Sequence, residues 1–175
     1  MEEAIDRSGL RYAIVRPALI FGKEDILINN MAWALRRFPV FPIHGSGEYQ
    51  LQPVFVEDVA RIAVRTSQET SNIVVDAMGP ETDSFDGLVR LIASKPGTRA
   101  RLVHLRPELS LALTKLVGYL VNDVILTRHE VEGLMANLLV SKGQPTGETL
   151  LSEWLEQNAG RLGRSYASEL NRHYR

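Results

Sequence analysis

The chain has 175 residues, 45% of them hydrophobic and 23% charged, with a formal net charge of −1 at pH 7 and no cysteine. This composition is that of a globular chain able to bury a core, and the charge argues against nucleic acid as a partner. Without cysteine there is no disulfide, thiolate metal site or cysteine nucleophile. No basic and apolar leader follows Met1, and the most apolar run, 109–121, is too short to span a bilayer. The sequence therefore predicts a cytoplasmic protein without a transmembrane segment.

The first part of the chain alternates predicted strands and helices. A helix over residues 2–8 ends at Gly9, and a strand over 10–15 must end at Pro17, which has no amide hydrogen to continue a ladder. The following elements are a helix over 26–37, an extended segment over 38–43, a strand over 54–56, a helix over 58–67, a strand over 73–76, a helix from Ser84 that stops at Pro96, and a strand over 101–105. In helix 58–67 the predicted core face consists of Val59, Ile62, Ala63 and Thr66. This alternation is typical of an α/β fold with a parallel sheet.

Beyond Pro107 the sequence predicts helices only. An apolar stripe begins at Leu109, residues 127–130 have the pattern of a capping box, and two further helices are expected over 152–162 and 165–173. We therefore expect two regions, an α/β region over 1–105 and an all-helical region over 106–175.

The sequence contains few motifs of known chemistry. No glycine-rich turn connects a strand to a helix, and Gly45-Ser46-Gly47 precedes a strand, which favours a plain turn over a phosphate-binding loop. The four histidines are scattered, without the spacing of metal ligands, so no metal site is predicted. The Gly-x-Ser-x-Gly pattern of hydrolases is also absent.

Two residues lie at places in the predicted fold where a ligand could bind. The loop after Arg16 follows the carboxyl end of a strand, where α/β proteins hold ligands; a ligand-facing loop and a plain strand exit remain equal alternatives. Asp58 is expected to open a helix directly after a strand, where its carboxylate can accept from free helix amides. For Asp58 the helix-terminus interpretation is favoured over a ligand role.

Two motifs together resemble a known family. Residues 15–22, Val-Arg-Pro-Ala-Leu-Ile-Phe-Gly, and residues 52–60, Gln-Pro-Val-Phe-Val-Glu-Asp-Val-Ala, are similar to the carboxyl-terminal half of extended or atypical short-chain dehydrogenases/reductases, the NAD-dependent epimerase/dehydratase and NAD(P)-binding proteins. The resemblance covers residues 1–105. It implies the carboxyl-terminal portion of a Rossmann-type parallel sheet, in which the first motif borders the nicotinamide and the second shapes the substrate pocket.

The resemblance assigns roles to individual residues. Cofactor-binding positions would be Pro17, Ala18, Leu19 and Phe21, and substrate-binding positions would be Arg16, Gln52, Val54 and Asp58. NAD or NADP would be the cofactor of the full-length protein, with none bound by this chain alone, and a small molecule would be the substrate.

The chain also departs from the family pattern. The glycine-rich turn and the catalytic Tyr-x-x-x-Lys are absent, so proton transfer to a carbonyl or hydroxyl has no candidate residue. Where sugar-nucleotide epimerases have Arg-Asp-Phe, this chain has Leu51-Gln52-Pro53, and leucine cannot bind a phosphate. These residues look more like the atypical branch that includes a respiratory complex I subunit.

The expected function is therefore the substrate-binding half of a reductase-like or epimerase-like protein, not catalytic on its own. The alternative is an assembly module that forms homo-oligomers, or binds a chain supplying the amino-terminal half, through the open edge of strand 10–15. A ligand pocket made by helices within 107–139 has no polar cluster to support it.

Overall fold

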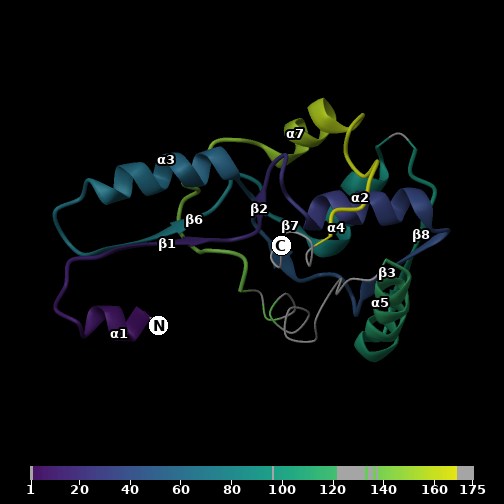
Figure 1. Cartoon of the computed structure of the whole chain (residues 1–175), viewed down its shortest axis with the longest axis horizontal. Coiled ribbons are helices and arrows are strands. Elements are labelled where there is room, and N and C mark those ends of the chain that lie inside the picture. The colour runs from purple at the N-terminus through teal and green to yellow at the C-terminus, as the bar shows by residue number, and fades with distance from the viewer. Residues whose placement is uncertain (1, 96, 122–132, 134–135, 137, 169–175) are drawn as a thin grey trace.

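The computed structural model describes residues 2–95, 97–121, 133, 136 and 138–168. Figure 1 shows an elongated molecule. At one end the helix α3 (Val56–Ser67) lies along the strands β1 (Ala13–Pro17) and β6 (Ile73–Ala77). At the other end lie the helices α2 (Leu27–Arg37), α4 (Phe85–Ala93) and α5 (Pro107–Val121), with the strands β3 (Val40–His44) and β8 (Arg101–Leu105).

The strands pair two by two, and three of the four pairs are parallel. β1 pairs with β6, β3 pairs with β8, and the short β2 (Ile20–Phe21) pairs with β5 (Val54–Phe55). The antiparallel pair joins β4 (Gln50–Leu51) to β7 (Asp83–Ser84). Parallel pairing through intervening helices confirms the predicted α/β class.

Local sequence signals explain where the helices begin and end. The carboxylate of Asp25 accepts from the amides of Leu27 and Ile28 at the start of α2, and Pro39 forces Phe38 into an extended conformation after its end. Ser84 caps α4, because its hydroxyl accepts from the amide of Gly87 at 3.0 Å. A further short helix, α1 (Glu2–Asp6), precedes Gly9, which has a φ of 71°.

The core contains the buried faces of α2 and α4 together with side chains from the carboxyl-terminal part of the chain. Helix α7 (Leu151–Asn158) contributes Trp154 and Leu155, and the ring of Trp154 meets that of Phe21 at 5.5 Å between centroids. The buried side chains of α2 are Ile28, Met31, Ala32 and Leu35, an i, i+3, i+4, i+7 set. Residues on both sides of position 106 thus share one core. In the described part of the chain no helix is both long and apolar enough to cross a membrane.

Several predicted boundaries differ from the structure. β1 extends to Pro17, and Ile20 and Phe21 form β2 where a loop was expected. α3 begins at Val56, two residues before the predicted start, and Ala63 is exposed on it, so the predicted core face is partly wrong. Leu109, in the predicted apolar stripe of α5, is 59% exposed.

The carboxyl-terminal helices differ too. The expected helix over 152–162 begins at Leu151 and ends at Asn158, and residues 165–168 of the last predicted helix are not helical. The predicted capping box at 127–130 lies outside the described residues.

Candidate functional site

The carboxyl ends of β1 and β6 meet at one edge and form a polar cluster. Arg16 forms an ion pair with Glu2 of α1 and lies 3.9 Å from the Asp76 carboxylate at the end of β6. The other carboxylate oxygen of Asp76 accepts from the hydroxyl of Ser141 at 2.9 Å. Hydrogen bonding to Glu2 raises the pKa of Arg16. Arg16, a predicted substrate residue, is therefore a charged and half-exposed group at this edge, already paired with two carboxylates.

The loop after β1, with the predicted cofactor residues, is tied to its neighbours by its backbone. The Ala18 amide donates to the carbonyl of Ala77 at 3.2 Å, and the Leu19 carbonyl accepts from the Val54 amide at 2.9 Å. Pro17 is exposed and Leu19 half-buried, whereas Phe21 is fully buried in the core. The part of this loop that is not fully buried is therefore apolar and lies at Pro17 to Leu19.

Gln52 and Val54, two predicted substrate residues, are both buried. The Gln52 side chain donates to the carbonyl of Gly79 at 2.9 Å and accepts from the amide of Ser141 at 3.2 Å. A Cβ on Gly79 would overlap the backbone of Pro53, so this close approach requires glycine. In this structure Gln52 joins two chain segments to each other.

Asp58 is a buried carboxylate with a full set of partners. One oxygen accepts from the amides of Glu148 and Thr149 at 2.9 Å each, and the other forms an ion pair with Arg61. Burial acts to raise the pKa of this carboxyl. The hydrogen bonds from residues 148 and 149 and the charge of Arg61 outweigh burial, and the pKa lies below its ordinary value. Asp58 therefore holds a distant segment, and its partners are not the amides of its own helix.

The segment over 139–149 was not predicted as part of the site, yet it crosses this edge of the molecule. The amide of Gln52 donates to the carbonyl of Leu139, and the hydroxyl of Thr146 donates to the carbonyl of Asp76 and accepts from the amide of Met78. Ser141 and Thr146, with Asp76, are the residues that sequence reasoning missed. No local pattern marks their contacts with Asp76 and Gln52, because the hydrogen bonds of Ser141 to these two residues span 65 and 89 positions in sequence.

A large cavity lies beside the loop, between α2, β3 and α5. Its volume is about 670 Å³, and of the eight predicted site residues only Leu19 is among its described lining residues. His44 closes part of the wall; it is 4% exposed, and its Nδ1 is hydrogen-bonded to the hydroxyl of Ser110. Burial lowers the pKa of His44. The cavity and the polar cluster at Arg16 are therefore separate features joined by the Pro17–Leu19 loop.

A metal site has no support in the described residues, which contain no group of three or more acidic or histidine side chains suited to hold a metal ion. His104 instead donates to the Asp86 carboxylate at 2.9 Å, and Asp86 is also paired with Arg90. Gly45 and Gly47 have φ values of 64° and 74°, as the predicted turn requires.

Comparison with known proteins finds similarity along most of the chain. No family model matches. The mitochondrial NADH dehydrogenase [ubiquinone] 1 alpha subcomplex subunit 9 of Arabidopsis thaliana is 24% identical over 151 residues, covering 80% of this chain and 38% of that protein. The chain thus spans well under half the length of this relative.

Two solved structures share the fold. A nucleoside-diphosphate-sugar epimerase from Staphylococcus aureus has a TM-score of 0.64 and 17% identity over 89% of this chain and 55% of its own. The dTDP-4-dehydrorhamnose reductase of Bacillus anthracis, in complex with NADP, has a TM-score of 0.50 and 14% identity over 62% of this chain and 38% of its own. The comparisons therefore agree that the chain has the fold of these epimerase and reductase structures, and that its sequence is similar to part of the complex I subunit.

Proposed function

We propose that this chain is the substrate-side half of an NAD(P)-dependent reductase-like or epimerase-like protein and is not catalytic on its own. The observation that carries the proposal is the loop after β1, which follows the carboxyl end of a parallel strand and ends on the wall of the 670 Å³ cavity through Leu19. Pro17, Ala18 and Leu19 would meet the nicotinamide end of the cofactor. Arg16, at the same edge, would face the substrate.

Four of the other predicted residues are buried. Phe21, Gln52, Val54 and Asp58 are each less than 5% exposed, and the polar atoms of Gln52 and Asp58 already have protein partners. Under the proposal these four residues support the site by fixing the loop and the 139–149 segment, and they do not touch a ligand directly.

The purified chain is expected not to bind NADPH alone. The glycine-rich turn that holds the pyrophosphate is absent from these 175 residues, and the loop's Ala18 amide and Leu19 carbonyl are used within the chain. Isothermal titration with NADPH should give no saturable heat at concentrations up to about 1 mM. A dissociation constant of about 1 mM corresponds to a binding free energy of only about 4 kcal/mol. A dissociation constant in the micromolar range would contradict the proposal.

A second candidate function, an assembly module, is favoured by the edge of β1. β1 pairs with β6 along one side, and its other side has no strand partner among the described residues. Leu10 before it is 70% exposed and Val74 on β6 is 42% exposed. An open strand edge with apolar side chains beside it is a template for pairing with another chain, either a second copy or one that supplies further strands.

Sedimentation equilibrium tests this second candidate. The chain at about 100 μM, a concentration at which weak dimers with micromolar affinity form, is expected to sediment as a dimer or larger species. Ala13→Lys places a charge at the open edge and should shift the population to monomer. Val64→Lys, on the exposed face of α3, is the matched control and should leave the assembly unchanged. A wild-type chain that remains monomeric would exclude self-association through β1.

A further inference from the structure

The cavity beside α2 has walls from several separate elements. Figure 1 shows α2, β3 and α5 gathered at the end of the molecule away from α3. Ala34 on α2, Phe41 on β3 and Val117 on α5 line the cavity, and Leu19 joins it from the loop after β1. Its volume, about 670 Å³, lies within the range of about 300 to 1,000 Å³ typical of small-molecule sites.

The described lining of this cavity is mostly apolar. Its described lining residues include no aspartate, glutamate, lysine or arginine, and aromatic rings contribute from Trp33, Phe38 and Phe85. A nucleoside diphosphate would have to leave its charges without a counter-charge against such a wall, which is strongly unfavourable. The described wall of the cavity therefore favours uncharged ligands over anionic ones.

One buried polar residue lines the cavity. This residue is His44, which is only 4% exposed and whose Nδ1 is hydrogen-bonded to the hydroxyl of Ser110. Its second ring nitrogen, Nε2, has no hydrogen-bond partner among the described residues. Because burial lowers the pKa of His44, the ring is neutral at pH 7 and carries one hydrogen. When Nδ1 accepts from the Ser110 hydroxyl, Nε2 can donate to an oxygen in the cavity.

We propose that this cavity binds an uncharged, largely apolar molecule whose single carbonyl or hydroxyl oxygen accepts a hydrogen bond from Nε2 of His44. Apolar surface supplies most of the binding free energy, and the histidine fixes which end of the molecule enters. This inference rests on the proposed function in one respect: Leu19, which lines the cavity, belongs to the loop proposed to meet the cofactor.

Binding to the purified chain without any dinucleotide tests the site directly. The probe is N-phenyl-1-naphthylamine, an uncharged dye whose fluorescence rises in apolar surroundings. We expect saturable binding to the wild-type chain and displacement by 1-dodecanol. Equal displacement of the probe by dodecanoate should need at least about ten times the concentration of 1-dodecanol, because dodecanoate must bring a charge to an uncharged wall. UDP-glucose should not displace the probe.

Filling the cavity should remove the site. Ala34→Phe and Val117→Phe add bulk from two different helices, and each is expected to weaken probe binding by at least tenfold. Ala63→Phe, on the exposed face of α3, is the matched control and should bind as the wild type does. Far-ultraviolet circular dichroism and urea unfolding show which of the filled variants retain the fold. Because the two substitutions lie on different helices, the test remains possible if one variant does not fold.

His44 has its own test. His44→Leu keeps an apolar wall and should weaken displacement by 1-dodecanol by about tenfold, the value of one hydrogen bond, with probe affinity changed by less than about twofold. The proposal is overturned if the wild type binds no probe, if both folded filled variants bind as the wild type does, or if UDP-glucose competes. These outcomes involve no dinucleotide, so they are distinguishable from failure of the NADPH experiment, which bears on the proposed function alone.

Discussion

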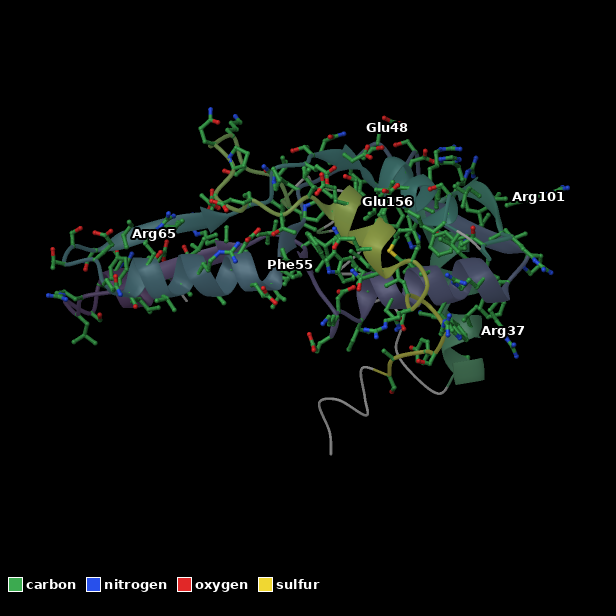
Figure 2. The ribbon with its side chains drawn as sticks, turned by 90° about the horizontal axis from the view of Figure 1, so that it is seen from above. Arg37, Glu48, Phe55, Arg65, Arg101 and Glu156 are labelled. Carbon is green, nitrogen blue, oxygen red and sulfur yellow. The ribbon has the colours of Figure 1, made fainter. Side chains whose placement is uncertain are left out.

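Replacing Phe21 by alanine is expected to lower the free energy of unfolding by about 3 to 5 kcal/mol, the usual loss for a buried phenylalanine. Phe21 is 0% exposed, and its ring lies 5.4 Å from that of Phe55 and 5.5 Å from that of Trp154. Removal of the ring therefore leaves a cavity between the loop after β1, the start of α3 and helix α7. Figure 2 labels Phe55 at the end of α3 nearest α7. Urea unfolding, followed by tryptophan fluorescence, measures the change.

This prediction separates two interpretations of Phe21. As a residue that touches the nicotinamide it would be partly exposed in the chain alone, and its loss would leave stability nearly unchanged. As a core residue it packs against Trp154 and so connects β2 to helix α7. Ile20→Ala is the matched control: Ile20 is the neighbouring residue of β2 and is 37% exposed, so its truncation should cost under about 1.5 kcal/mol. Equal effects of the two substitutions would place Phe21 outside the core.

Elements whose signals are local could be predicted from the sequence. The strand over 101–105 has the predicted bounds, and the helix predicted from Ser84 is capped by that residue. The proline at 39 correctly ends α2 before an extended segment. Where one residue type dictates the backbone, the prediction holds because no distant contact competes with it.

Elements formed by distant contacts could not be predicted in the same way. Ile20 and Phe21 form a strand only because Val54 and Phe55 lie beside them, which no pattern within 18–22 indicates. On α5 the polar Ser110 is fully buried beside His44, and Leu109, where the predicted apolar stripe begins, is exposed, so periodicity alone misplaced the start of the stripe. The cavity depends on α2, β3 and α5 together and has no sequence motif of its own.

The candidate functional site could also be predicted only in part. The loop after Arg16 was correctly placed at the carboxyl end of a parallel strand, because Pro17 fixes where β1 ends. The partners of the buried carboxylate at Asp58 were not foreseen, because the amides that it accepts from belong to residues 90 and 91 positions later. A helix-terminus carboxylate and one that holds a remote segment look alike in sequence.

Asp58→Ala is expected to lower the free energy of unfolding by about 3 kcal/mol at pH 7, because two backbone amides lose a charged acceptor in a buried place. Arg61→Ala is the matched control. It removes only the ion pair, and Arg61 is 59% exposed, so the cost should stay under about 1 kcal/mol. Similar losses in the two variants would mean that the ion pair, and not the amides of residues 148 and 149, is the main contribution of Asp58.

The pH dependence of stability in the wild type and in Asp58→Asn gives an independent test. The pKa of Asp58 is lower in the folded chain than its ordinary value of 3.8, so the folded state holds the proton less tightly than the unfolded state does. The stability that Asp58 contributes is therefore complete above the ordinary pKa and is lost as the pH falls through the lowered one. Urea unfolding at pH 7 and at steps below pH 5 should show the wild type losing its advantage over Asp58→Asn toward acid. A difference between the two that stays constant, or grows, below pH 4 would contradict a buried carboxylate held ionised by the 148–149 amides.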